Sequence, residues 1–171
     1  CVECWDIEDE GSGYRSLEGD SDNEVIHDYS YSPYWRTHTL LEERFSDGIS
    51  FELETEIDRG ADRFSEAKKA IDLGGELWGD SPFFASDDGS LDNGVEYTFH
   101  PFTYAWFKGS RNLLSEVLTS LRENCKSHNT KTCGLHIHID RNSASPLTLY
   151  KMIRFWYYNQ SFIEFIAGRK A

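Results

Sequence analysis

The sequence predicts an α+β domain, because strand-like and helix-like patterns follow one another along the chain. Ile49–Ile57 and Cys133–Asp140 alternate apolar and polar residues, which is the period-two pattern of β-strands. Apolar residues recur at helical spacing in three stretches, residues 63–73, 111–124 and 146–167. With two shorter strands in between, the expected order is β–α–β–β–α–β–α. The last helix is expected to bury a continuous apolar face.

The strand at Ile49–Ile57 begins the globular body and divides its side chains between two faces. Its odd-numbered residues are apolar or threonine and are expected to face the core. Glu52, Glu54 and Glu56 share the opposite face, where successive carboxylates lie about 7 Å apart, twice the rise of a strand residue. That separation suits a shared metal cluster, although a solvated strand face has the same pattern.

Two helices are expected in the middle of the domain. Asp62 has the side chain of an N-cap for the first helix, and Gly74-Gly75 would end it. Ser110 is expected to cap the second helix, whose leucine-rich stripe faces the core.

Two short strands, Phe83–Ala85 and Val95–Phe99, flank a turn rich in Asp and Gly at residues 87–94. The apolar residues of the second strand are expected to point inward. Glu96 would then lie on the open face, together with the glutamates of the first strand. An exposed strand glutamate without a further role is the alternative.

The strand at Cys133–Asp140 repeats this geometry with imidazoles. His136 and His138 are expected on one face, and Leu135, Ile137 and Ile139 on the core face. Histidine is the commonest metal ligand among side chains, and carboxylates suit Mg²⁺ or Mn²⁺. If the acidic strands and the histidine strand pair in one sheet, the sequence predicts a mixed carboxylate–imidazole metal site.

The formal net charge of −13 argues against nucleic acid as a partner, since phosphate binding requires a basic surface. The excess is concentrated at the start of the chain, where residues 1–48 hold 13 acidic and 3 basic side chains. The remaining residues carry 17 acidic and 14 basic side chains, which leaves a nucleotide with its Mg²⁺ acceptable as a ligand.

Residues 1–24 are acidic and poor in apolar residues, so they are expected to form a linker. Cys1 and Cys4 within it have the spacing of half a zinc site, whose other ligands would lie outside this chain. Residues 25–45 carry aromatic residues without a clear period and are expected to drape over the domain. No signal-peptide pattern opens the sequence and no apolar run reaches the ~20 residues that span a bilayer, so a cytoplasmic protein without membrane contact is expected.

Three motifs in this order resemble the amidoligases, which are carboxylate–amine ligases related to glutamine synthetase and frequent in phage genomes. The motifs are Phe51-Glu52-Leu53-Glu54, then Asp88-Gly89-Ser90-Leu91 leading to Gly94-Val95-Glu96, then Cys133-Gly134-Leu135-His136-Ile137-His138. The resemblance covers residues 25–171 and implies a catalytic domain with a glutamine-synthetase-like antiparallel sheet and helices packed on one face. For a phage protein, the compartment would be the cytoplasm of the host. The chain ends soon after Arg169, before the final strand of the family, so the domain is expected to be truncated.

The resemblance also implies roles for individual residues. The metal ligands would be Glu52, Glu54, Glu96, His136 and His138, with His138 alternatively holding the substrate carboxylate. Arg169 would lie near the nucleotide phosphates, and Glu54, His138 and Arg169 would be the catalytic residues.

The implied reaction joins a carboxylate to an amine through an acyl phosphate, using ATP and Mg²⁺ or Mn²⁺. Its substrates would be small molecules, peptides or protein side chains, and the oligomeric state is not predicted. A metal-dependent hydrolase with the same ligands is the first alternative. A metal-binding interaction module without catalysis is the second.

Overall fold

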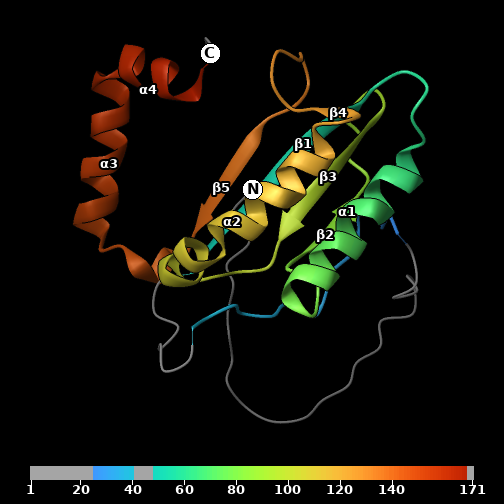
Figure 1. Ribbon diagram of the computed structural model, residues 1–171. Coiled ribbons are helices and arrows are strands. Elements are labelled where there is room, and N and C mark those ends of the chain that lie inside the picture. The colour runs from blue at the N-terminus through green and yellow to red at the C-terminus, as the bar shows by residue number, and fades with distance from the viewer. Residues whose placement is uncertain (1–24, 41–47, 169–171) are drawn as a thin grey trace. The chain divides into compact units, whose positions relative to one another are not determined.

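The computed structural model describes residues 25–40 and 48–168. By their internal contacts these residues divide after Ile139 into two compact units. The predicted α+β class is confirmed, since the described residues form one antiparallel sheet of five strands together with four α-helices (Figure 1).

The central strand of the sheet is β1 (Ile49–Ile57). On one side it pairs with β3 (Gly94–Phe99), which pairs in turn with β2 (Phe83–Ser86). On the other side β5 (Leu135–Ile139) pairs with the first half of β1, and β4 (Cys125–Lys126) pairs with its last two residues. All of these pairs are antiparallel. Because β1 lies between β3 and β5, side chains from three different strands meet on each face of the sheet.

The core lies on one face of this sheet. Val95 and Tyr97 of β3 point into it and are 0% and 1% exposed, as the apolar pattern of that strand predicts. Thr55 and Ile57 of β1 are buried on the same face. Glu96 therefore lies on the opposite face, because successive side chains of a strand alternate.

Helix α1 (Arg63–Trp78) begins at the predicted cap, Asp62, whose carboxylate accepts a hydrogen bond of 2.8 Å from the Ser65 amide. Its predicted end was wrong, because the helix runs through Gly74-Gly75. It stops at Gly79, which has a left-handed φ of 81° and donates its N–H to the Gly75 carbonyl. Burial of the apolar face of the helix stabilises it by more than the two internal glycines destabilise it.

Helix α2 (Tyr104–Leu121) begins seven residues before the predicted position. Its cap is Thr103, whose hydroxyl accepts from the Trp106 amide, and not Ser110. Ser110 is buried within the helix, where its hydroxyl accepts a 3.2 Å hydrogen bond from the Trp78 indole of α1. This contact ties the two helices together.

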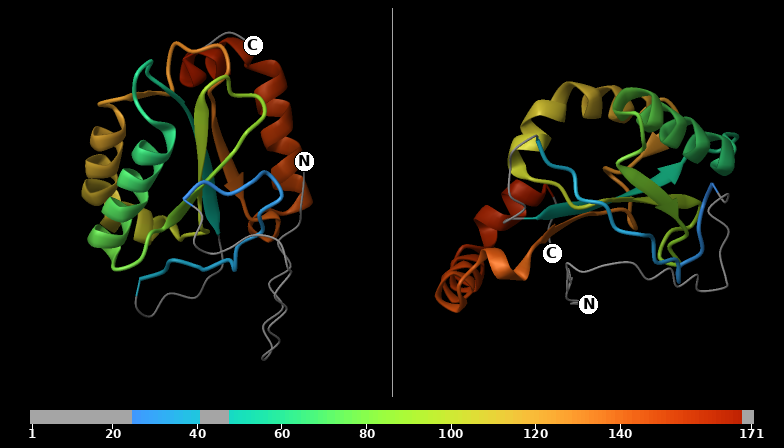
Figure 2. Two further views of the ribbon diagram at one scale, coloured as in Figure 1. Left: turned by 90° about the vertical axis from the view of Figure 1, so that its right-hand side faces the viewer. Right: turned by 90° about the horizontal axis from the view of Figure 1, so that it is seen from below.

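The helices α1 and α2 lie on one side of the sheet, and the segment of residues 25–40 lies on the other (Figure 2). We refer to residues 25–40 as the strap. A bridge between His27 and Ser86 fixes one part of the strap beside β2, and a bridge between His38 and Phe102 fixes another. Residues 25–40 thus lie along the domain, as predicted for the segment of residues 25–45.

One predicted core face was wrong. Leu135, Ile137 and Ile139 of β5 are 58%, 65% and 57% exposed instead of buried. The reason is the position of β5 at the edge of the sheet: α1 packs against β2 and β3, on the other side of β1. Alternation identified the two faces of β5 correctly, but it did not show which part of the sheet the helices cover.

The second unit begins with a short 3₁₀-helix (Arg141–Ser143) and continues with α3 (Pro146–Tyr158) and α4 (Gln160–Ala167). The single helix predicted for residues 146–167 was wrong, because the backbone of Asn159 leaves helical geometry at φ −126°. The Asn159 amide donates to the Phe155 carbonyl, a side-chain bond that competes with the helical pattern. The predicted buried face was also wrong, since no residue of either helix is buried. Among the described helices, none has the length and apolar character needed to cross a membrane.

Candidate metal centre

The pairing of three strands brings the predicted site residues together on the face that carries the strap, called here the open face. Glu54 lies directly opposite Glu96 in the β1–β3 pair. Glu52 lies directly opposite His136 in the β1–β5 pair. Directly opposed residues have Cβ atoms about 5 Å apart, so the two side chains of each pair can bind the same cation.

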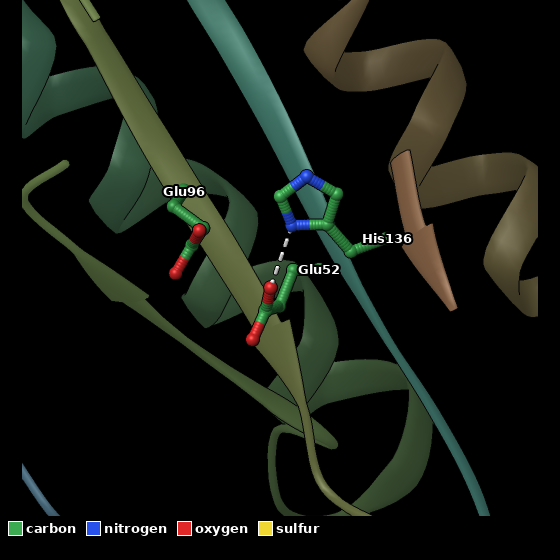
Figure 3. Close-up of side chains that lie close together, drawn as sticks. All are labelled: Glu52, Glu96 and His136. Carbon is green, nitrogen blue, oxygen red and sulfur yellow. Dashed lines mark hydrogen bonds and ion pairs between the residues drawn. The ribbon is translucent and has the colours of Figure 1, made fainter. Parts of the chain in front are cut away.

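Glu52 lies between the two histidines of β5. Its Oε2 is 2.9 Å from Nδ1 of His136, and its Oε1 is 3.1 Å from Nε2 of His138. Figure 3 shows the His136 ring directed at the Glu52 carboxylate, with Glu96 beside them on the neighbouring strand. Because each imidazole contacts a different oxygen, both carboxylate oxygens of Glu52 are oriented by β5.

Glu54 is the most buried acid of the centre, at 5% exposure. Its Oε1 lies 3.6 Å from Nε2 of His136. Gly134 has no side chain to occupy the space beside this contact. A Cβ atom there would lie 3.3 Å from Glu54 Oε2 and 3.6 Å from His136 Nε2. A side chain at position 134 would fill the gap between carboxylate and imidazole, and glycine leaves it open.

In the part of the chain that the structure describes, two groups of three residues present ligand atoms within 4.8 Å of one another. The first consists of Glu52, Glu96 and His136, and the second of Glu54, Asp88 and Glu96. Glu96 belongs to both groups, so its carboxylate is placed to connect two neighbouring cation positions. His138 belongs to neither group and contacts Glu52 instead.

Asp88 was not among the predicted site residues, because an aspartate is expected in a turn and needs no further role there. The turn assignment holds, since its Oδ1 accepts a 2.7 Å hydrogen bond from the Ser90 amide. The same residue also lies near Glu54 and Glu96. The observation that reveals the role of Asp88 is the pairing of β2 with β3. Ser86 is opposite Glu96 in that pair, which brings the start of the turn to this end of the site.

The electrostatics of the centre are those of crowded acids. Hydrogen bonding to His138, followed by that to His136, holds the pKa of Glu52 below its usual value despite burial. Burial, and then the negative charge of Glu52, raises the pKa of Glu96. The hydrogen bond that the Glu52 carboxylate accepts from His138 in turn raises the pKa of His138. Burial and the neighbouring acids therefore oppose the ionisation of Glu96.

This arrangement fits a divalent cation. Within the described part of the chain, no lysine or arginine forms an ion pair with Glu52, Glu54 or Glu96. Buried carboxylates normally require a counter-charge, and the histidines supply one only when they are protonated. Carboxylate oxygens with one imidazole are a ligand set that suits Mg²⁺ or Mn²⁺. The space next to Gly134 lies between two of these ligands.

Three of the predicted functional residues lie outside the described residues, namely Arg169, Cys1 and Cys4. The structure brings the other five together on one face of the sheet, which the sequence analysis expected only if these strands pair in one sheet. Their roles as ligands or catalytic groups stay predictions.

Comparison with known proteins adds one finding. Residues 101–168 match the model of a family described as "Putative amidoligase enzyme". The chain matches the amidoligases over this stretch. The amidoligase match includes His136 and His138 but neither β1 nor β3, so it agrees with the resemblance without covering the three glutamates. The family name indicates an enzyme of the amidoligase kind. No curated protein and no solved structure matches the chain.

Proposed function

We propose that the open face is the active site of an ATP-dependent carboxylate–amine ligase. The observation that carries this proposal is the meeting of Glu52, Glu96 and His136, from three strands, with potential ligand atoms within 4.8 Å of one another. The amidoligase match supports the class of reaction. The absence of lysine and arginine partners for these acids among the described residues supports a cation in that place.

Two cation positions are proposed. Glu52, Glu96 and His136 would hold one cation, and Glu54, Asp88 and Glu96 would hold the other. Mg²⁺ or Mn²⁺ bound there would neutralise charge on the ATP phosphates and on the acceptor carboxylate. His138 reaches the same face from β5 and is proposed to orient the acceptor carboxylate.

The proposed reaction has two steps. A carboxylate oxygen of the first substrate takes the γ-phosphoryl group of ATP, which forms an acyl phosphate and releases ADP. The nitrogen of the second substrate then attacks the carbonyl carbon and loses a proton to water, while phosphate leaves. Activation is needed because a free carboxylate has no adequate leaving group. The protein contributes mainly positioning and charge neutralisation to such a transfer.

A screen for ADP release by the full chain tests this function. Pools of carboxylates and amines are incubated with ATP and Mg²⁺ or Mn²⁺. We expect ADP release that requires one member of each pool and the cation. Glu54→Gln and His136→Ala should abolish it while leaving the circular dichroism spectrum unchanged. Arg169→Gln should raise the KM for ATP, since its predicted place is beside the phosphates.

Two results would contradict the ligase. Wild-type rates in Glu54→Gln and His136→Ala would remove the open face from the chemistry. Cation-dependent cleavage of a substrate without any need for ATP would instead indicate a hydrolase that uses the same ligands.

A further inference from the structure

Two hydroxyl groups converge on one oxygen of Glu96. Thr98, on the same strand, donates to Glu96 Oε1 at 3.1 Å, and Ser86, opposite Glu96 on β2, donates to the same atom at 3.4 Å. Both residues are buried, at 7% and 8% exposure. Among residues 25–40 and 48–168, no group donates a hydrogen bond to the other oxygen, Oε2.

This choice of acceptor differs from that of other strand hydroxyls in the sheet. Thr55 donates to the Val95 carbonyl at 3.0 Å, and Ser50 donates to the Phe99 carbonyl. Those bonds satisfy the hydroxyl within the β-ladder and would serve stability alone. Thr98 and Ser86 instead donate to a carboxylate, and hydrogen bonds to a charged acceptor are stronger than those to a neutral one.

The arrangement has a direct geometric consequence. A carboxylate on a strand can rotate about its terminal bonds, and broad torsional wells leave its oxygens poorly fixed. Two donors on Oε1 fix the plane of the Glu96 carboxylate and leave Oε2 available. Glu96 is also the residue shared by both groups of potential ligands, so its orientation affects two cation positions together.

The strap holds the backbone on both sides of Ser86 by hydrogen bonds. His27 donates its backbone N–H to the Ala85 carbonyl at 2.9 Å, and its own carbonyl accepts from the Asp87 amide at 2.9 Å. Ser86 lies between these two bonds. The hydroxyl that reaches Glu96 from β2 is therefore held by pairing on both edges of that strand, with β3 and with the strap.

We propose that Thr98 and Ser86 are positioning residues that orient the Glu96 carboxylate for cation binding. The inference rests on the proposed function, because it concerns the same cations. Partners that orient a metal ligand in this way typically change metal affinity by about 10- to 100-fold when they are removed.

The test measures Mn²⁺ binding to the full chain from the electron paramagnetic resonance signal of free Mn²⁺, without any substrate. Thr98→Val removes the hydroxyl and keeps the shape of the side chain. We expect it to weaken Mn²⁺ binding about tenfold, and Thr98→Ser to restore binding to near the wild-type value. Ser86→Ala should weaken binding by a similar or smaller factor.

Thr55→Val is the matched control. It removes a buried hydroxyl from the adjacent strand, on the core face, so it costs a comparable hydrogen bond without touching Glu96. We expect unchanged Mn²⁺ affinity in this variant. If Thr98→Val does not fold, Ser86→Ala is compared with Thr98→Ser, since the first variant removes one donor to Oε1 and the second keeps both.

The outcomes separate this inference from the proposed function. If Glu96→Gln abolishes Mn²⁺ binding but Thr98→Val and Ser86→Ala bind like wild type, the cation site stands and the positioning roles are wrong. Equal weakening by Thr98→Val and Thr55→Val would also overturn them, because the effect would then be one of general stability. If Glu96→Gln binds Mn²⁺ like wild type, the cation site itself is wrong.

Discussion

Glu54 and Glu96 lie directly opposite each other on adjacent antiparallel strands, with both carboxylates on the open face of the sheet. Like charges in directly opposed positions destabilise a sheet, by up to about 1 kcal/mol per pair. Glu54 is almost fully buried, so water screens this repulsion poorly. The protein without cations therefore carries a local electrostatic penalty, which a bound cation would remove.

Glu96→Gln is expected to stabilise the protein in the absence of metal. Removing one of the two opposed charges should raise the free energy of unfolding by roughly 0.5–1 kcal/mol. The same change should abolish the stabilisation that Mn²⁺ gives to the wild type. Urea denaturation with and without Mn²⁺ measures both effects.

Glu116→Gln serves as the control for Glu96→Gln, since Glu116 is an exposed residue of α2 and the net charge changes equally. Its response to Mn²⁺ should match that of the wild type. A Glu96→Gln variant that is less stable without metal, yet still stabilised by Mn²⁺, would show that the opposed pair carries no such penalty.

Gly134→Ala is expected to weaken cation binding without unfolding the protein. The added methyl would lie 3.3 Å from Glu54 Oε2, a tight contact at the point where the carboxylate faces His136. Displacement of either ligand should reduce Mn²⁺ affinity by about tenfold. Calorimetric titration with Mn²⁺ provides the measurement.

Gly75→Ala is the control for Gly134→Ala, because a Cβ atom at position 75 meets nothing within 4 Å. In the interior of α1 it should stabilise the fold by roughly 0.5–1 kcal/mol and leave Mn²⁺ affinity unchanged. Equal affinities for Gly134→Ala and wild type would mean that the space beside Gly134 is not part of the cation site.

Alternation along the strands was sufficient to predict the open face. Glu52, Glu54 and Glu96 could be assigned to one side of the sheet because strand residues alternate strictly, whatever the tertiary context. That the histidine strand pairs with β1 was not predictable from periodicity, since pairing depends on contacts between distant segments. The amidoligase resemblance supplied the expectation that these strands share one site.

Other features depend on interactions that a local pattern does not contain. Ser110 has the side chain of a cap, but its hydroxyl contacts Trp78 on another helix. Asn159 lies within an apolar helical pattern, and its side-chain bond to Phe155 interrupts the helix. Asp88 and Thr98 looked like turn and strand residues, and only the register of β3 reveals that they lie near the other acids.

Gly94→Ala is expected to destabilise the fold. A Cβ atom at this position would collide with the Thr55 carbonyl oxygen and lie 2.8 Å from Cβ of Leu91. The Thr55 carbonyl belongs to the central strand, so relief of the clash requires backbone movement. The cost should be about 2 kcal/mol in the free energy of unfolding, measured by urea denaturation.

Gly89→Ala is the matched change for Gly94→Ala, because a Cβ atom at position 89 of the same connection meets nothing within 4 Å. Its effect should stay within about 0.5 kcal/mol. Similar stabilities for the two variants would indicate that β1 and β3 do not approach each other as closely as described.

Two neighbouring histidines, the half-buried His38 of the strap and the buried His100, give the protein a specific sensitivity to acid. The rings of His38 and His100 have centroids 6.0 Å apart, and His100 also contacts Trp35 and Phe84. Burial, followed by the neighbouring His38 and Arg36, lowers the pKa of His100 to about 4. Burial, followed by Arg36, lowers the pKa of His38 as well.

The free energy of unfolding is therefore expected to fall as the pH drops from about 6.5 towards 4. In that interval the unfolded chain binds a proton at His100 that the folded chain does not bind, so protons favour unfolding. His100→Phe keeps an aromatic ring in the same place and removes the titration. Between pH 7 and 4.5 the wild type should lose about 2 kcal/mol more stability than this variant. Urea denaturation at several pH values measures both curves, and parallel curves would show that His100 is not held neutral by its surroundings.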